Sequence, residues 1–319
     1  MQRFDKEFRT LKYVIAKSDR ILLFAHNRPD PDTVGANIAL AEYLLSLGKH
    51  VDIACLDPFP ETLRTLTDKT FVHPETLRLK SYDAIIASDS VDRGFDTLSD
   101  LFNEDQVIVL IDHHPDILLS GDIVMIDSEY SSSSEIIYLF LNSVEAPLTK
   151  SIATMLLTGI LFDTGGFQHS NVSPRVMEIA STLLKKGAPL SKISQTIFAH
   201  KNISALRLWG KAFEKAKLNP ENGMLVTAIT QKDVEECAAS VEDIYQVTSI
   251  LSAVPDAKFA LVLSERENNI VRASLRSMDH HGIDVSAIAH QFGGGGHRLA
   301  SGFEIPGKII ETETGFRIQ

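Results

Sequence analysis

The amino-acid sequence predicts an α/β protein in which a doubly wound, mostly parallel sheet is joined by a helical linker to a smaller α/β domain. The first observation is that short apolar runs alternate with helical patterns from residue 21 to about 128, as βαβ units require. The second is that a new series of strand-like runs begins after "NPENG" at 219–223. We therefore expect a first domain over 1–187, a helical linker over 188–214 and a second domain over 215–319.

The first domain is expected to contain short strands rich in β-branched and other apolar residues. Such runs suit strands that are buried on both faces of a parallel sheet. Helical periodicity follows the first strand in "VGANIALAEYLLSLG", where Gly48 marks the end of the helix. Further helices are predicted from "SSEIIYLFLNSV", "SIATMLLTGILF" and "PRVMEIASTLLKKG". The expected strands lie at 21–25, 51–56, 82–88, 106–111 and 122–126.

The second domain is expected to be a smaller mixture of strands and a helix. "MLVTAIT" predicts one strand, and "KFALVLSERENNIVRASLRS" predicts two strands joined at "ENN". "DVSAIAHQFGGGGHRLASGFEI" predicts a helix, a glycine-rich turn and a further extended segment. We find no internal repeat and no low-complexity tract in the sequence, so two unrelated domains are the simplest organisation.

The bulk composition is that of an ordinary globular protein and argues against a membrane protein. Of the 319 residues, 44% are hydrophobic and 23% are charged, and no run of about eighteen apolar residues occurs. The N-terminal segment is charged and amphipathic and lacks the apolar core of a signal peptide. Cys55 and Cys237 lie far apart without metal-ligand spacing, so we expect buried, inert thiols. A cytoplasmic location, where thiols stay reduced, is the expectation.

The net charge restricts the kind of partner that the chain can bind. A formal net charge of −11 argues against a protein that coats long nucleic acid by neutralising its phosphates. It does not argue against a small phosphate-bearing substrate, because a local cationic pocket or a bound metal can dominate the field near a site.

Acidic and imidazole side chains follow several of the predicted strands at the point where each strand ends. Because ligands bind beyond the carboxyl ends of strands in open parallel sheets, these side chains are expected to meet at one edge. Asp163 is a further candidate, since it ends an apolar run in "GILFDTGGF". The residues that follow strands are His26, Asp30 and Asp32, then Asp89, then Asp112, His113 and His114.

Each of these residues alone has an ordinary structural explanation, but their combination predicts a metal site. A single Asp after a strand is usually a turn or helix-cap residue, as Asp32 could be after Pro29 and Pro31. Carboxylates gathered in one crevice repel each other unless cations lie among them. Mixed imidazole and carboxylate ligands suit Mn²⁺, Fe or Zn better than Mg²⁺. Four carboxylates with two imidazoles exceed the needs of one tetrahedral ion and match a two-metal site.

The second domain adds the segment "FGGGGHRLASGF", which predicts an anion-binding site for a phosphate or a carboxylate. Glycines let the backbone approach a ligand and present amide N–H groups to it, although a lone glycine run is also typical of a flexible loop. The spacing is neither that of a dinucleotide fingerprint nor that of a P-loop. Arg272 and Arg276 share one face of a predicted strand, where a solvated face is nearly as good an explanation as substrate contact. The candidate binding residues are Gly294, Gly295, Gly296, His297, Arg298 and Arg276.

With these residues in view, the sequence resembles the DHH phosphoesterase superfamily. "HNRPDPD" resembles its first motif, Asp89 in "ASDSVDR" its second, "DHH" at 112–114 its third and Asp163 in "FDTGGF" its fourth. "FGGGGHRLASG" is similar to the signature of the associated DHHA1 domain. The motifs occur in order over nearly the whole chain. The length and layout resemble the bacterial branch of nanoRNases, which also act on 3′-phosphoadenosine 5′-phosphate and on linear or cyclic dinucleotides.

The resemblance implies roles for individual residues. His26 and Asp30 would hold one metal, and Asp32, His113 and Asp163 the other, with Asp89 bridging the two. Asp112 would orient an imidazole through a hydrogen bond, and His114 would face the substrate phosphate. His297 and the glycine amides would bind a substrate phosphate from across the cleft, with help from Arg298. Asp32, Asp89 and His114 are thus the residues expected to carry catalysis.

The expected activity is hydrolysis of short oligonucleotides or small nucleotides by a hydroxide that two metal ions activate. Mn²⁺ is the expected ion, with Co²⁺, Fe²⁺ and Mg²⁺ as alternatives. A manganese pyrophosphatase, a single-strand exonuclease on longer nucleic acid and a non-catalytic nucleotide sensor are the competing hypotheses. No membrane contact is expected. The family often forms dimers, so a homodimer is among the expected states, although no interface can be identified in the sequence.

Overall fold

The computed structural model describes residues 3–98, 101–114, 119–199, 202–244, 247–312 and 315–319. The chain separates into two compact units, Met1–His200 and Lys201–Gln319. The helical segment expected over 188–214 is present as α6 (Leu190–Ser194), the π-turn η6 (Gln195–Ala199) and α7 (Ile203–Glu214), and its residues 200–201 lie outside the described part. The domain limits at 187 and 215 stay a prediction.

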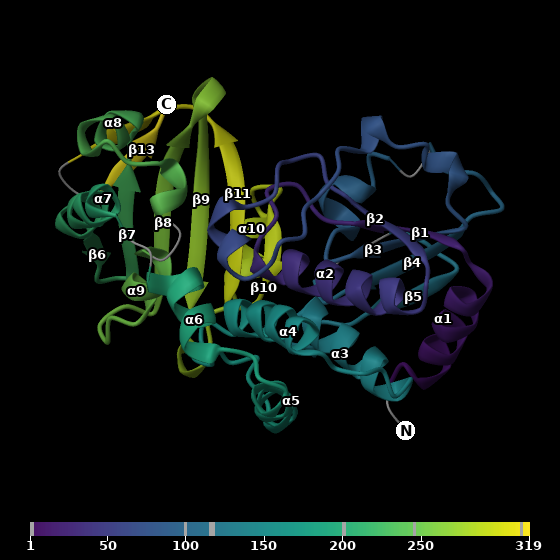
Figure 1. The fold of residues 1–319 in the computed structure, drawn as a ribbon. Coiled ribbons are helices and arrows are strands. Elements are labelled where there is room, and N and C mark those ends of the chain that lie inside the picture. The colour runs from purple at the N-terminus through teal and green to yellow at the C-terminus, as the bar shows by residue number, and fades with distance from the viewer. Residues whose placement is uncertain (1–2, 99–100, 115–118, 200–201, 245–246, 313–314) are drawn as a thin grey trace. The chain divides into compact units, whose positions relative to one another are not determined.

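The first unit is built on a parallel five-stranded sheet with the strand order β2-β1-β3-β4-β5 (Figure 1). The chain passes from β1 to β2 on one side and then returns to β3 on the other side of β1. In such sheets the crevice at this reversal is where ligands bind. The strands are β1 (Arg20–Phe24), β2 (His50–Ala54), β3 (Ala84–Ser88), β4 (Val107–Asp112) and β5 (Ile123–Ile126).

Both faces of this sheet are buried, but by different kinds of structure. Ile21 and Leu23 of β1 belong to a hydrophobic cluster formed with long helices, whereas Leu22 and Phe24 belong to a second cluster on the opposite face. That opposite face is covered mainly by loops and short turns, among them η3 (Leu79–Ser81) and the π-turn η4 (Val91–Phe95). Two further turns follow β2, namely η1 (Glu61–Thr65), whose Leu63 belongs to the first cluster, and η2 (Pro74–Thr76). The long helices are α1 (Asp5–Lys17), α2 (Pro31–Ser46), α3 (Ser133–Ser143), α4 (Lys150–Asp163) and α5 (Pro174–Lys185).

The sequence explains where the helices around the sheet begin. Asp30 caps α2, since its Oδ1 accepts hydrogen bonds from the backbone N–H groups of Asp32 and Thr33, and Pro31 occupies the first turn. Ser132 caps α3 by accepting from the N–H of Glu135. Two helix starts rich in polar groups are thereby placed where a site for charged ligands can form.

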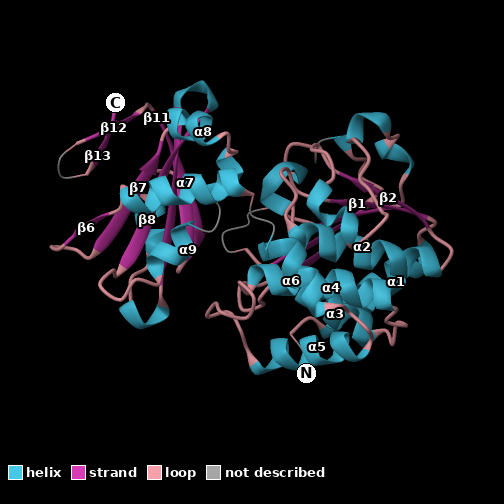
Figure 2. Cartoon of the chain, turned by 60° about the vertical axis from the view of Figure 1, so that its left-hand side comes forward, coloured by secondary structure: helices cyan, strands magenta, loops and turns pink. Residues whose placement is uncertain are grey.

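The second unit is built on a six-stranded mixed sheet with the order β10-β11-β9-β8-β7-β6. Figure 2 draws its strands in magenta, with its helices in cyan. The pair β7–β8 is parallel and the other pairs are antiparallel. Strands β12 (Ile309–Glu311) and β13 (Phe316–Ile318) form a separate hairpin. The sheet strands are β6 (Lys217–Asn219), β7 (Met224–Ile229), β8 (Phe259–Arg266), β9 (Ile270–Ser277), β10 (Gly295–His297) and β11 (Ala300–Pro306).

Helices pack on both faces of this second sheet. α7 buries Leu208 and Ala212 in one cluster with β7 and β8, and α10 (Val285–His290) buries Val285 and Ala289 in a second cluster with β9 and β11. The remaining elements are α8 (Gln231–Cys237), α9 (Val247–Ser252), η7 (Val241–Ile244), η8 (Glu267–Asn269) and η9 (Asp279–His281).

The predicted α/β fold is confirmed, with two local corrections. Short turns replace α-helices between β2 and β3, where Pro58, Pro60 and Pro74 lack the N–H groups that a long helix needs. The glycine-rich segment is only partly a turn, because Gly295–His297 pairs with β11 as a strand. Cys55 and Cys237 are buried, as expected. In the described part of the chain no helix has the length and apolar character needed to cross a bilayer.

Candidate metal centre

The six predicted metal ligands meet in the first unit, at the carboxyl edge of its sheet. His26, Asp30 and Asp32 lie on the connection from β1 into α2, and Asp89 follows β3 directly. His113 follows β4, and Asp163 is the last residue of α4. Side chains from distant segments therefore converge where the strand order reverses. An acid at the C-terminal end of a helix opposes the helix dipole, so Asp163 needs a compensating positive charge nearby.

Asp89 lies at the centre of this group. Its Oδ2 is 3.5 Å from His26 Nε2, and its Oδ1 is 3.6 Å from the Nε2 of His113. The ligand atoms fall into two sets that each span less than 4.8 Å, and Asp89 belongs to both. Asp163 Oδ2 adds a contact of 3.1 Å to His113 Nε2. The two sets are His26, Asp30 and Asp89, and Asp32, Asp89 and His113.

The backbone at Asp89 is held in an uncommon conformation. Its φ of 59° lies in the left-handed region, which non-glycine residues rarely adopt apart from Asn and Asp. The N–H of Asp89 donates to the carbonyl oxygen of Ile111 at 2.9 Å, so β4 fixes the turn. Strained backbone of this kind persists where the surroundings enforce it and is concentrated at functional sites.

His26 presents a lone pair to the carboxylates. Its Nδ1 lies 2.7 Å from the carbonyl oxygen of Asn27, which can only accept, so in the neutral ring Nδ1 donates and Nε2 keeps its lone pair. Nε2 is 3.3 Å from Asp30 Oδ2 and 3.5 Å from Asp89 Oδ2. The hydrogen-bond acceptors of the imidazole and of the two carboxylates therefore face one another in a buried site. A cation between them would stabilise this arrangement.

Asp32 is held by the first turn of α3. Its Oδ2 accepts from the N–H of Ser133 at 2.8 Å, and its Oδ1 accepts from the N–H of Ser134 at 3.0 Å. The positive end of the helix dipole favours a carboxylate at this place. Gly159 of α4 leaves the space for it, because a Cβ there would lie 2.3 Å from Asp32 Oδ1. Two helices therefore fix one carboxylate.

The electrostatics of the group favour cations. Burial, with repulsion from Asp32 and Asp30, raises the pKa of Asp89 well above its ordinary value. Burial and the charge of Asp163 likewise raise the pKa of Asp32. Burial alone would lower the pKa of His113, but the hydrogen bond and charge of Asp163 outweigh it and raise that pKa to about 9. In the absence of metal, protons are the only counter-charge available to these groups.

Several buried acceptors in the group lack hydrogen bonds. Among the residues that the structure describes, none makes a hydrogen bond to His26 Nε2 or Asp89 Oδ2. Unsatisfied buried polar atoms are costly and call for an explanation. A divalent cation supplies one, since imidazole nitrogen and carboxylate oxygen are its ordinary ligands. The donor set therefore fits a divalent metal site, and the shared Asp89 fits a pair of ions.

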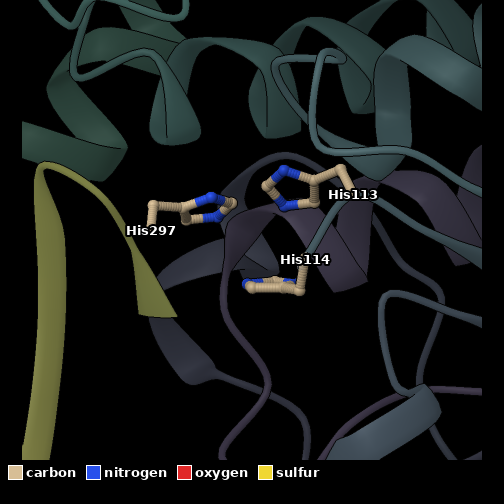
Figure 3. A group of neighbouring side chains, drawn as sticks. All are labelled: His113, His114 and His297. Atoms are coloured by element: carbon tan, nitrogen blue, oxygen red, sulfur yellow. The ribbon is translucent and has the colours of Figure 1, made fainter. Parts of the chain in front are cut away.

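Asp112 and His114 form a separate pair beside the ligands. The rings of His113 and His114 lie side by side after β4, with centroids 4.4 Å apart (Figure 3). His114 Nδ1 hydrogen-bonds Asp112 Oδ1 at 2.7 Å. Burial would raise the pKa of Asp112, but this bond and the neighbouring imidazoles lower it to about 2. Asp112 thus hydrogen-bonds the imidazole of His114, and the orienting role expected for it stays a prediction.

The candidate binding residues of the second unit lie on the outer strands of its sheet. His297 of β10 is opposite Ala300 of β11, and Ala300 is opposite Arg276 of β9. Residues directly opposite each other in antiparallel strands point to the same face, so His297 and Arg276 share a face. Arg272 lies on it as well, as the spacing predicted. Arg298 instead forms an exposed ion pair with Asp279 at 3.0 Å.

Different structural reasons explain why the positions of this segment are glycine. A Cβ at Gly294 would lie 2.2 Å from the carbonyl oxygen of Gly302, and Gly296 has a φ of 132°. Both positions therefore require glycine for the fold itself. A Cβ at Gly295 would approach only the ring of His290, at 3.5 Å, so the packing does not explain that glycine.

Sequence reasoning missed the residues that hold the ligands in place. Ser133 donates its hydroxyl to Asp89 Oδ1 at 3.2 Å. Asn37 of α2 donates from its side-chain amide to the carbonyl oxygen of Ser88 at 3.1 Å, next to Asp89. Glu135 is fully buried and accepts from Arg175. The run of serines at the start of α3, after β5, is the sequence feature that could have indicated such supporting residues.

Comparison with known families gives two matches that together span most of the chain. Residues 20–160 match the profile described as the DHH family, N-terminal domain, and residues 222–313 match the DHHA1 domain. The first match contains His26 to Asp89 and the Asp112–His114 motif, and the second contains the glycine-rich segment. Asp163 lies just beyond the first match.

Curated relatives and a solved structure resemble the whole chain. The bifunctional oligoribonuclease and PAP phosphatase NrnA of Thermus thermophilus is 28% identical over 300 residues, 91% of this chain and 86% of that protein. The protein of the same name from Bacillus subtilis is 28% identical over 297 residues, 91% of each chain. The crystal structure of an exopolyphosphatase-related protein from Bacteroides fragilis has a TM-score of 0.85 at 24% identity, over 95% of this chain and 92% of that one. This last likeness concerns the fold alone.

Proposed function

Because the chain belongs to the DHH/DHHA1 phosphoesterase family, and is therefore a phosphoesterase hydrolase, we propose that it degrades short oligonucleotides to mononucleotides and removes phosphate from 3′-phosphoadenosine 5′-phosphate. Linear dinucleotides such as pApA belong to the same substrate class, and cyclic dinucleotides are a further candidate. The names of the relatives from Thermus thermophilus and Bacillus subtilis state both activities for those proteins. Their similarity over about nine-tenths of this chain supports the proposal.

The observation that carries the proposal is the lone pair of His26 Nε2, which faces two carboxylates in a buried place. Its contacts of 3.3 and 3.5 Å are repulsive unless positive charge lies between the atoms. Two divalent cations would be held here by His26 and Asp30 on one side and by Asp32, His113 and Asp163 on the other, with Asp89 shared. Mn²⁺ is the ion that this mixture of nitrogen and oxygen ligands suits. When bound, such a pair supplies an activated water and neutralises phosphoryl charge.

The other residues of the first unit position the substrate. Asp112 holds His114 through Nδ1, so the opposite side of the ring is directed away from Asp112. In its protonated form the ring also donates from Nε2, and a charged donor binds a phosphoryl oxygen better than a neutral one. We assign His114 to the phosphoryl group that reacts, and Asp112 to the orientation of His114.

The second unit selects the substrate by a phosphate that does not react. His297 and Arg276 lie on the same face, and Gly295 brings backbone close to that face without a side chain. Nitrogen donors of this kind bind phosphate oxygens without reading a base. Arg298 is a weaker candidate because Asp279 already pairs with it. A net charge of −11 opposes binding along a long polyphosphate backbone, which favours short substrates.

A substrate panel with added Mn²⁺ tests this function. We expect release of mononucleotides from pApA and a trimer, release of phosphate from 3′-phosphoadenosine 5′-phosphate, and no turnover with a chelator. Faster cleavage of a long oligomer than of the trimer would instead identify an exonuclease. Preference for pyrophosphate would identify a pyrophosphatase. Binding of pApA without turnover at any metal concentration would identify a sensor.

A further inference from the structure

The first turn of α3 contacts two of the carboxylates at once. Ser133 donates its backbone N–H to Asp32 Oδ2 at 2.8 Å and its hydroxyl to Asp89 Oδ1 at 3.2 Å. Asp32 lies on α2 and Asp89 follows β3, so these two carboxylates are far apart in the chain. Ser133 itself has no accessible surface. One buried residue therefore links two carboxylates that come from different elements.

We infer that Ser133 is a positioning residue, which fixes the carboxylate of Asp89 relative to that of Asp32 before any cation binds. The inference rests on the proposed metal-dependent function and assigns to this serine a part in it. The backbone of Asp89 is already held by Ile111, so rotation of its carboxylate is the freedom that remains. The hydroxyl of Ser133 removes this freedom, because it binds Oδ1 and so directs Oδ2 toward His26.

The hydroxyl of Ser133 has no role in starting the helix. Ser132 is the cap of α3 and accepts from the N–H of Glu135 at 3.1 Å. The segment before the helix is held by Glu135, whose Oε2 accepts from the N–H of Ser131 at 2.7 Å. Glu135 in turn accepts from Arg175 at 2.6 Å. Since capping and anchoring are carried by neighbours, the hydroxyl of Ser133 is left with Asp89 as its partner.

The experiment compares Ser133→Ala with Ser131→Ala in the full chain. Ser131 is equally buried, but its hydroxyl has no hydrogen-bond partner within the described part of the chain, so it is a matched control. Mn²⁺ binding is measured by titration calorimetry, and coupling between bound Mn²⁺ ions by electron paramagnetic resonance. We expect Ser133→Ala to weaken binding of at least one ion about tenfold, or ~1.4 kcal/mol, and to change the coupling. Ser131→Ala should bind Mn²⁺ within about twofold of wild type.

A third variant separates positioning from stability. Alanine favours helix and glycine disfavours it, so Ser133→Ala and Ser133→Gly should differ in melting temperature. Because both lack the hydroxyl, both should show the same weakened binding. A loss of affinity that follows melting temperature across the variants would overturn the inference, as would wild-type affinity and coupling in Ser133→Ala. If wild-type protein bound no pair of ions, the proposed function itself would fail, which is a different result.

Discussion

The two groups of candidate residues differ in how firmly the fold holds them. The metal ligands of the first unit are mostly buried, and backbone N–H groups, a helix dipole and a left-handed turn fix them. The candidate phosphate-binding residues of the second unit are half-buried or exposed side chains on outer strands. The first arrangement gathers carboxylates whose mutual repulsion protons or metal ions relieve, whereas the second can adapt to its ligand. Changes in the first unit should therefore affect the chemistry, and changes in the second should affect binding.

The largest effect is expected from Asp89→Asn. Asn tolerates the left-handed conformation and keeps the shape, so the change removes a charge and leaves the fold intact. We expect turnover with Mn²⁺ to fall at least about a thousandfold, or ~4 kcal/mol. The melting temperature of metal-free protein should rise, because a buried charge that repels Asp32 and Asp30 is gone. Steady-state kinetics and calorimetry with a chelator measure both results.

Asp68→Asn, which changes an exposed carboxylate, is the control for this variant. Its turnover and melting temperature should match wild type. Asp32→Ala gives a second test of the same centre. If Asp32→Ala or Asp89→Asn retained more than about a hundredth of the wild-type rate, a loss of only ~2.7 kcal/mol, the two-metal assignment would be wrong.

A smaller but still large effect is expected from Gly159→Ala. The new methyl group would lie 2.3 Å from Asp32 Oδ1 and 2.1 Å from Ser134 Oγ, so the carboxylate must move. We expect a rate loss of about a hundredfold and destabilisation of ~1–3 kcal/mol, the usual cost of overpacking. Gly210→Ala is the matched control, because that helical position has open space around it and alanine should stabilise α7. Equal rates in both variants would contradict the packing argument.

The metal-free protein should lose stability as pH rises. The pKa of His113 is raised from 6.5 to about 9, so its protonated form stabilises the fold fully below pH 6.5 and this contribution disappears toward pH 9. The pKa values of Asp32 and Asp89 are raised above 3.8, so the folded state holds protons that the unfolded state has released. These two groups therefore also lower stability as the pH rises above 3.8. We expect a loss of at most ~3 kcal/mol from His113, measured as melting temperature against pH with a chelator.

Mn²⁺ binding should show the opposite trend, because the ion displaces a proton from His113. Affinity should rise up to about tenfold per pH unit between 6.5 and 9. His113→Asn should flatten the stability profile over this range. An unchanged slope in that variant would show that His113 is not the titrating group.

The smallest effects belong to the second unit. His297→Ala and Arg276→Ala should each raise KM for a dinucleotide about tenfold, or ~1.4 kcal/mol, with kcat changed less than threefold. Arg298→Ala should change KM by less than about threefold, since Asp279 already competes for that side chain at the exposed surface. A tenfold fall in kcat with constant KM for His297→Ala would place this residue at the reacting phosphate instead.

The rule that ligands lie beyond the carboxyl ends of parallel strands was sufficient to find His26, Asp89 and the Asp112–His114 motif. It worked because strand ends are visible in the sequence as the limits of apolar runs. Asp163 ends a helix instead, and it was found only because an apolar run ends there too. The family assignment and the α/β class were predictable for the same reason.

The supporting residues were not predictable in this way, because their roles depend on distances between elements. Gly159 looks like any helix glycine until α2 and α3 are seen to approach it. In the sequence nothing distinguishes Ser133 from Ser132 and Ser134, because its role depends on where the fold places Asp89. The turns between β2 and β3 were missed because prolines break a helical pattern without revealing what replaces it.

The positive φ of Asp89 has a consequence for how metal preference can change in this protein. At His26, His113 and Asp163 an imidazole, carboxylate or thiolate could be exchanged at ordinary backbone cost. At position 89 a cysteine or a glutamate would be disfavoured by the backbone itself, whereas aspartate, asparagine, histidine and glycine tolerate it, and of these only aspartate offers two carboxylate oxygens to share. Adaptation to a softer ion should therefore proceed through the outer ligands, around a bridging oxygen donor that stays the same.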